Sequence, residues 1–502
     1  MASRDMAVGK MILSALLFFG VSAAGAVTLV RNFPFRRDAL IRRLEQRTGV
    51  KLTIGSFRER WFPPGFDAGQ VRVTDREGDV LNIGAMRLEC SYAGLLRNPA
   101  TLDRIEVKGL RLAIDTKAGA ARQILSSKVG VVIGAMRIED GAIDVSSGTD
   151  GKPPVEFLVH SLTLHDLGPD RNLRFEVALH NPKPSGEVRA RGTIGSLDAK
   201  DPGHASAAGD FTFTNADLTA DDAITGLLNA SGQFHGPLKM LAVKGTADVP
   251  RFEVRSSNHT VHIAARFDTT VNAMDGSAAL NEIVTHFDRT TVTARGTVAN
   301  DAGRPGKTLT VNATVEDGRV EDLVKLFSRD TPGMQGAIRF QARFTIPPGP
   351  PDFLTKLRAE GEFAIRHARF TNPNAQAPVN RLSASAEGES KQEAREHPVL
   401  ATAEIHGRVM DRNGVARLTH VVFATPGVQG ELAGTFALKP RNVDLNGKFE
   451  TSGKLADTTS GFKALIVKAM GPLWPKKGKV KEIPFTITGR AGHPVFHLKL
   501  RD

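Results

Sequence analysis

Ala337-Ile-Arg-Phe-Gln-Ala-Arg-Phe-Thr-Ile346 alternates apolar and polar residues without a break. Successive side chains of a β-strand point to opposite faces, so this order predicts a strand with one apolar and one polar face. Similar alternation recurs from about residue 50 to the end, for example in residues 174–179 and 308–315. The sequence therefore predicts a mainly β protein built from many short strands, punctuated by glycine and Asx residues.

The composition is typical of an ordered chain with a basic surface. The 502 residues are 41% hydrophobic and 24% charged, with a formal net charge of +12. The basic residues are spread over the polar faces of the predicted strands, and no nucleic-acid recognition motif accompanies them, so we expect no nucleic-acid partner. Cys90 is the single cysteine, which excludes an internal disulfide.

An uncharged run of 20 residues, 11–30, lies near the start of the chain. A helix of that length rises about 30 Å, which matches the hydrocarbon core of a bilayer. We interpret residues 1–35 as an uncleaved membrane anchor with its flanks. A cleaved secretory signal ending near Ala24-Gly-Ala26 is the alternative. The apolar residues of the predicted anchor are Ile12, Leu13, Leu16, Leu17, Phe18, Phe19, Val27, Leu29 and Val30.

Both interpretations of this segment export the rest of the chain. The arginines that follow it, between residues 31 and 43, outnumber the basic residues before it, and the positive-inside rule would then favour a cytoplasmic body. Long domains translocate largely regardless of such charges. We therefore expect an exported body.

Three segments have helical rather than strand periodicity: 38–47, 320–327 and 459–473. The last is an amphipathic helix followed by lysines, and it either lies on a membrane surface or closes the end of the sheet. The proline-rich segment Ile346–Asp352 is the clearest linker. It divides the body into an N-terminal β region, 36–346, and a C-terminal β region, 347–502.

No catalytic or cofactor motif accompanies the strands. The sequence contains no Walker-type phosphate loop, no dinucleotide fingerprint and no nucleophile elbow. His259 and His262 would lie on opposite faces of a strand, which disfavours a shared metal ion. We expect no enzyme activity, no cofactor and no metal site.

The order of segments resembles the AsmA-like family. An apolar anchor and a short helix precede Thr48-Gly-Val-Lys-Leu-Thr-Ile-Gly55 and Arg60-Trp-Phe-Pro-Pro-Gly-Phe66. Near the end, the amphipathic helix precedes Ile483-Pro-Phe-Thr-Ile-Thr-Gly489. The resemblance implies a single-pass anchor in the bacterial inner membrane, a periplasmic body with an apolar β-groove, and a role in phospholipid transport and outer-membrane biogenesis.

These observations predict an elongated, curved antiparallel sheet whose apolar face shields lipid acyl chains. The expected partners are a phospholipid or other acyl-chain lipid, the inner membrane and other envelope proteins. Two alternatives remain: a non-enzymatic scaffold or regulator of outer-membrane protein assembly with a closed β core, and a secreted β-sandwich or adhesin-like array released by signal cleavage. The residues predicted to line the apolar face are Leu309, Val311, Ile338, Phe340, Phe344, Ile346, Phe363 and Ile365.

Overall fold

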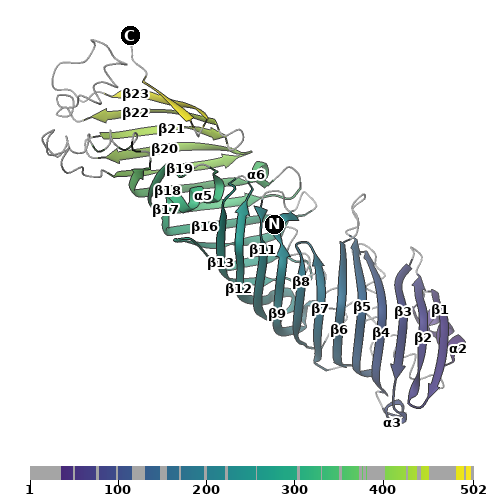
Figure 1. Cartoon of the computed structure of the whole chain (residues 1–502). Coiled ribbons are helices and arrows are strands. Elements are labelled where there is room, and N and C mark those ends of the chain that lie inside the picture. The colour runs from purple at the N-terminus through teal and green to yellow at the C-terminus, as the bar shows by residue number, and fades with distance from the viewer. Residues whose placement is uncertain are drawn as a thin grey trace, which may run out of the picture.

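A computed structural model shows one long, open β-sheet with few helices (Figure 1). This confirms the prediction of a mainly β protein. The structure describes residues 36–48, 51–74, 79–97, 100–115, 131–146, 155–168, 171–196, 201–220, 224–255, 257–301, 306–329, 331–349, 353–371, 373, 376, 380, 402–425, 428–437, 442–451, 482–490 and 493–498.

The strands follow one another through the sheet almost in chain order. The first part contains β1 (Lys51–Trp61), β2 (Pro64–Thr74), β3 (Asp79–Glu89), β4 (Ala100–Asp115), β5 (Val131–Ser146), β6 (Val155–Leu167), β7 (Leu173–Pro182), β8 (Ser185–Ile194), β9 (Ser206–Asp217), β10 (Ile224–Thr225), β11 (Leu227–Pro237) and β12 (Leu241–Val254). The second part contains β13 (Thr260–Val271), β14 (Ala278–Phe287), β15 (Thr290–Asn300), β16 (Lys307–Arg319), β17 (Met334–Ile346), β18 (Arg358–Phe370), β19 (Ala403–Arg412), β20 (Val415–Thr425), β21 (Val428–Ala437), β22 (Asn442–Thr451), β23 (Ile483–Arg490) and β24 (His493–Leu498). Each strand pairs with the next, except that β9 pairs with β11 and the short β10 adds to β12.

The sheet is mixed rather than purely antiparallel, which corrects the prediction. β4 and β5 run parallel, with Leu102 opposite Ile133 and Leu112 opposite Ile143. Parallel neighbours need a crossover that returns the chain to the end where the first strand began. Residues 116–130 separate the two strands in the chain. Alternation of apolar and polar residues sets the face of a strand but carries no information about its direction, so the sequence could not show this pair.

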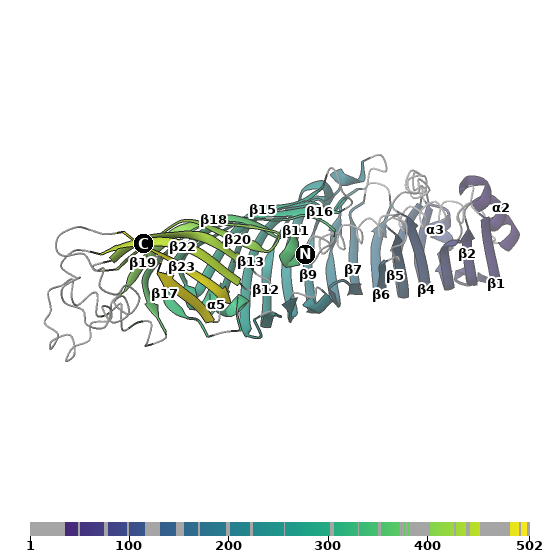
Figure 2. The same cartoon turned by 90° about the horizontal axis from the view of Figure 1, so that it is seen from above.

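The direction of the strands turns along the sheet. In Figure 1 the strands near β2 run steeply, whereas those near β21 run across the view, and Figure 2 shows the same strands from above. Shifts of register recur between neighbouring strands, including β13 with β14, β17 with β18 and β20 with β21. Two residues at such shifts, His367 and His420, have positive φ. Bulges of this kind bend a strand and increase its twist.

The described helices are short and lie at the margins of the sheet. They are α2 (Arg37–Thr48), α3 (Tyr92–Leu95), α5 (Val320–Phe327) and α6 (Phe353–Lys356), with 3-10 turns η1 (Pro202–His204), η2 (Leu218–Ala220) and η3 (Leu238–Met240). The helices predicted at 38–47 and 320–327 are thus confirmed. None of the helices in the described ranges is long and apolar enough to cross a membrane. The predicted anchor in 1–35 and the closing helix 459–473 lie outside the described residues.

Helix α2 lies beside the edge strand β1. The Leu52 N–H donates to Glu45 Oε1 at 3.0 Å, and the Arg37 guanidinium donates to the Ile54 carbonyl. Leu40 of the helix is buried in the same apolar cluster as Leu52 and Ile54 of β1. The helix therefore supplies partners for backbone groups at an edge that would otherwise be open to strand addition.

Helix α5 is fixed to the β14–β15 turn by a buried carboxylate. Asp322 is 1% exposed, and it accepts hydrogen bonds from the Arg289 N–H at 3.0 Å and from Thr290 Oγ1 at 2.9 Å. On its other side, Leu323 and Leu326 pack against apolar residues of β12 to β15. The helix therefore covers one end of these strands on their apolar face.

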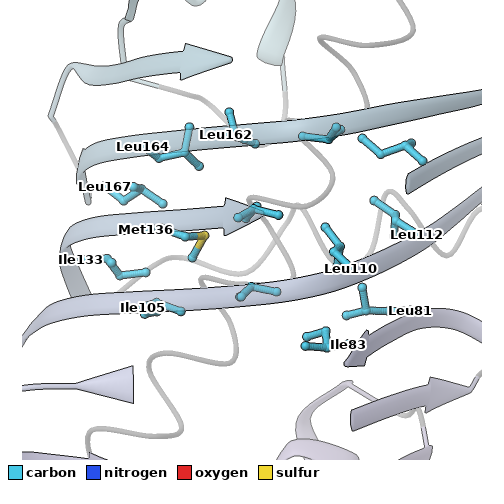
Figure 3. Packing of buried hydrophobic residues seen from close by; sticks show 14 of the residues in the cluster. Leu81, Ile83, Ile105, Leu110, Leu112, Ile133, Met136, Leu162, Leu164 and Leu167 are labelled. Carbon is cyan, nitrogen blue, oxygen red and sulfur yellow. The ribbon is translucent and has the colours of Figure 1, made fainter. Parts of the chain in front are cut away.

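The largest group of buried side chains lies on one face of the N-terminal strands (Figure 3). Register partners share it, as Ile83 faces Leu110 and Met136 faces Leu164. The group extends to β12, and the described strands beyond β12 carry only much smaller buried clusters. Strands β3 to β6 contribute Leu81, Ile83, Ile105, Leu110, Leu112, Ile133, Met136, Leu162, Leu164 and Leu167.

Candidate functional site: an apolar row along the sheet

The eight residues predicted to line an apolar face come from β16, β17 and β18, and the strand register brings them together. They form four cross-strand pairs on one face, because antiparallel register partners point to the same side. On β17 the neighbouring Arg339, Gln341 and Arg343 are exposed on the opposite face. The pairs are Leu309 with Ile346, Val311 with Phe344, Phe340 with Phe363, and Ile338 with Ile365.

Two phenylalanines are the most accessible large side chains that residues 337–346 of β17 contribute to the apolar face. Residues four apart on a strand have Cα atoms about 13 Å apart. The ring centroids of Phe340 and Phe344 are only 6.1 Å apart, so the two rings lean toward each other. Ala342 lies between them and is 4% exposed, whereas both rings are half-buried. Anything that approaches the apolar face here meets the rings first.

The apolar face continues along the whole described sheet. A single line of register partners, called the apolar row below, takes one residue from every strand from β1 to β23 except β10. No member has a polar side chain. Neighbouring strands are about 4.8 Å apart, so the row extends on the order of 100 Å along the sheet. Its members are Phe57, Ala68, Met86, Val107, Ile138, Leu162, Val177, Ala190, Phe211, Gly232, Gly245, Phe267, Ile283, Ala294, Ala313, Ala342, Gly361, Val409, Leu418, Gly434, Leu445 and Ile487.

Burial changes along the apolar row. Val107 and Ile138, on β4 and β5, are 2% and 1% exposed. From β7 onward the larger side chains of the row, such as Phe211, Phe267 and Leu418, are only half-buried. The row is therefore closed by packing in its N-terminal part and partly accessible along the rest of the described sheet.

Phenylalanines of this face lie over glycines of the neighbouring strand. A Cβ added to Gly245 would lie 2.7 Å from Phe267 Cζ, and one added to Gly447 would lie 2.5 Å from Phe485 Cζ. A Cβ added to Gly209 would likewise lie 2.7 Å from Phe234 Cζ, and one added to Gly430 would clash with the ring of Phe423. Aromatic rings are known to cover glycines across strands in this way. The rings therefore lie low on the sheet, which keeps the apolar surface shallow and continuous.

The face of the sheet opposite the apolar row, called the outer face below, carries a hydrogen-bonded Ser–His–Glu network that the sequence reasoning missed. On the β7–β8 hairpin, Ser185 Oγ lies 3.1 Å from His180 Nε2, and His180 Nδ1 lies 2.8 Å from Glu187 Oε1. His160 Nε2 adds a contact of 3.0 Å to Glu187 Oε2. The hydrogen bonds from His180 and then His160 hold the pKa of Glu187 below its usual value.

This order of groups is that of a catalytic triad, which also needs oxyanion donors aimed at a bound substrate. Ser185 is exposed beside a hairpin turn, on the face opposite the apolar row. That position fits a network that stabilises the hairpin. Its sequence signal is the equal spacing of His180 and Glu187 from the turn, which register makes into partners.

The described residues contain no cluster of three or more metal-ligating side chains. His262 Nε2 instead contacts Asp248 Oδ1 at 2.6 Å across two strands. Cys90 is buried, and its Sγ donates to the Pro64 carbonyl at 3.2 Å. Burial, with a smaller contribution from Asp103, raises the pKa of this thiol to about 11. The thiol is therefore a packing group.

Comparisons with known proteins returned nothing: no model of a known family, no curated protein and no solved structure matches the chain.

Proposed function

We propose that the chain shields lipid acyl chains along the apolar row, in the manner of a groove formed by a curved sheet. The observation that carries the proposal is the continuity of the row, which has no polar member from β7 to β23 and whose larger side chains there are half-buried. Contiguous apolar surface that stays partly accessible marks interaction sites on soluble proteins. Bulges between successive strands support the curvature.

The energetics favour such a surface for lipid. Exposing a sixteen-carbon acyl chain to water costs on the order of 12 kcal/mol, at about 0.8 kcal/mol per CH₂. Covering one side of the chain with the apolar row recovers a large part of that cost without any catalytic group. The row is several times longer than one leaflet of a bilayer core, which is about 15 Å. A lipid could therefore occupy many equivalent positions along it.

We also propose that residues 1–35 anchor the protein in the bacterial inner membrane, with the β-sheet in the periplasm and a role in phospholipid transport for outer-membrane biogenesis. The support is the apolar run and the resemblance to AsmA-like proteins. Intact mass of the mature protein distinguishes an anchor from a cleaved signal. Protease treatment of spheroplasts should digest the sheet, and its protection would contradict a periplasmic body.

Photocrosslinking of the full-length protein in membranes tests the proposed shielding. We expect phospholipid adducts from a benzoylphenylalanine at position 340 or 344, and few from the same group at position 339 or 343. The rings of Phe340 and Phe344 are the outer surface of the apolar face, whereas Arg339 and Arg343 point away from it. Equal adducts from both faces, or none from either, would refute the proposal.

A second candidate function is a scaffold for outer-membrane protein assembly whose apolar face is a closed core. The large buried cluster of β1 to β12 favours this alternative for the N-terminal part. Native mass spectrometry separates the two. A scaffold with a closed core would carry no lipid, whereas a shielding protein should retain phospholipid after detergent is removed.

A further inference from the structure

Asp411, on β19, is a carboxylate within the otherwise apolar face. Asp411 follows Val409, a member of the apolar row, by two residues on the same strand, so both side chains point to the same face. Its register partners are Ala359 on β18 and Ala416 on β20. Continuing outward, Ala359 faces Phe344 and Ala416 faces Phe436. Asp411 therefore lies in a cross-strand line whose other members are apolar, close to the turn at which β19 ends.

This carboxylate is buried and has no hydrogen-bond partner in the described part of the chain. Asp411 is 5% exposed, and neither of its oxygens meets a donor there. The burial raises the pKa of the carboxyl above its usual value. On the strands from β16 to β20, the other charged residue of this face is Lys307, three strands away on β16. A buried charge normally has a partner, because desolvation without one is costly.

The surroundings restrict what an incoming partner could be. The half-buried Phe344, Leu418 and Phe436 make the approach apolar, so a hydrated metal cation or a polar peptide would lose more hydration than one carboxylate restores. An ammonium group at the end of an apolar body fits both features. Its N–H donors satisfy the carboxylate with a charge-assisted hydrogen bond, while its chain covers the neighbouring side chains.

On the opposite face of the sheet, the same end of strands β18 and β19 is basic. Arg412 lies directly opposite Arg358 on the outer face, and both are exposed. Like charges opposite each other across two strands are unfavourable unless an anion lies between or near them. A zwitterionic head group, with an ammonium and a phosphate, would match the acidic inner and basic outer positions.

We propose that Asp411 is a head-group site, which binds the primary ammonium of an aminophospholipid whose acyl chain lies on the apolar face. This inference rests on the proposed shielding of acyl chains and adds selectivity to it. The site distinguishes lipids by hydrogen-bond donors. A primary ammonium can donate to the carboxylate, whereas a trimethylated ammonium of the same charge cannot.

The test uses the full-length protein incubated with vesicles of phosphatidylethanolamine and phosphatidylcholine that carry identical acyl chains. Lipid retained after detergent-free purification is counted by native mass spectrometry. We expect about a tenfold preference for phosphatidylethanolamine, since hydrogen bonds to charged groups contribute enough for one order of magnitude. Asp411→Asn should abolish the preference, because the retained phosphatidylethanolamine should fall to the level of phosphatidylcholine. Asp444→Asn, an exposed aspartate on the outer face of β22, is the matched control and should retain the preference.

A second measurement needs no variant. Carbodiimide couples a carboxylate to a nearby amine with loss of water, so the wild-type protein should yield a phosphatidylethanolamine adduct on the peptide that contains Asp411. In lipid-free protein, Asp411→Asn should raise the melting temperature, because it removes an unpaired buried charge. A lower melting temperature would mean that a base of the chain itself pairs with Asp411, and would overturn the proposal.

The outcomes separate this inference from the proposed function. Retention of both lipids with no head-group preference would overturn the role of Asp411 and leave the shielding intact. Absence of both lipids would overturn the shielding together with the head-group site.

Discussion

Replacing Phe340 with aspartate would place a charge directly in the proposed path of acyl chains. Phe340 is half-buried on the apolar face, opposite Val315 and Phe363. Thr345→Asp is the matched control, because residue 345 is on the outer face of the same strand. Its register partner is Arg358, so the added carboxylate gains a favourable cross-strand neighbour.

The size of the effect follows from the protonation of the new carboxylate. With no lipid present, an aspartate at position 340 stays hydrated, because the position is half-exposed. An acyl chain that covers it must remove that water, and the least costly route is protonation. At pH 7 and a pKa of about 3.9, protonation costs about 4 kcal/mol, and the lost ring contact adds about 1 kcal/mol. Lipid affinity at this strand should therefore fall by about 5 kcal/mol, roughly three to four orders of magnitude.

The assay places a photocrosslinker at position 363, the register partner of residue 340. In the full-length protein in membranes, Phe340→Asp should reduce phospholipid adducts below a tenth of the starting yield, while Thr345→Asp leaves them unchanged. The melting temperature of each variant shows that the sheet is intact. Phe344→Asp serves if the first variant fails to fold. Undiminished adducts in a folded Phe340→Asp protein would refute the reasoning.

Three further predictions concern the rest of the sheet. Cys90 should resist maleimide at pH 7.5 until the protein unfolds, because its pKa is raised to about 11 and it is buried; mass spectrometry with and without urea measures this. Asp322→Ala should lower the free energy of unfolding by about 1–3 kcal/mol, because it leaves the buried Thr290 hydroxyl and the part-buried Arg289 N–H without their acceptor, and chemical denaturation that shows no loss contradicts this role. Glu187→Gln should lower the melting temperature at pH 7, and this difference should shrink as the pH falls below the unfolded pKa of about 4.3. A carboxylate with a lowered pKa stabilises the fold above its unfolded pKa, and the effect is lost as pH falls through its folded pKa. A difference that does not shrink with falling pH would contradict the assignment.

The strands and their sidedness could be predicted because alternation is a local signal. Ile338, Phe340 and Phe344 alternate with polar residues within a single strand, and in the structure their side chains share one face. The helix at 320–327 could be predicted for the same reason, since its apolar residues recur at helical spacing within one segment.

The missing parts depend on register, which the sequence does not state. The apolar row, the contact of Gly245 with Phe267 and the network around Glu187 all join residues from different strands. The parallel pair β4–β5 depends on the path of the connection between the strands. The position of Asp411 could be noticed in the sequence, because every second residue before it on the strand is apolar or glycine: Ile405, Gly407 and Val409. Only its burial, and the lack of a hydrogen-bond partner among the described residues, make the position unusual.

The two candidate functions require opposite properties of the same face. The N-terminal part of the apolar row has the burial that a closed core requires, and the later part has the accessibility that a lipid surface requires. A closed core requires burial, which Val107 and Ile138 have. A surface for lipid requires accessibility together with an unbroken apolar path. From β15 to β18 the members of the row are alanine and glycine, and on β17 the rings of Phe340 and Phe344 lean toward each other across Ala342. Side chains that cover their own strand keep the surface apolar and low, which a packed core does not require and a sliding acyl chain does. This arrangement favours shielding of lipid over scaffolding for the strands beyond β7.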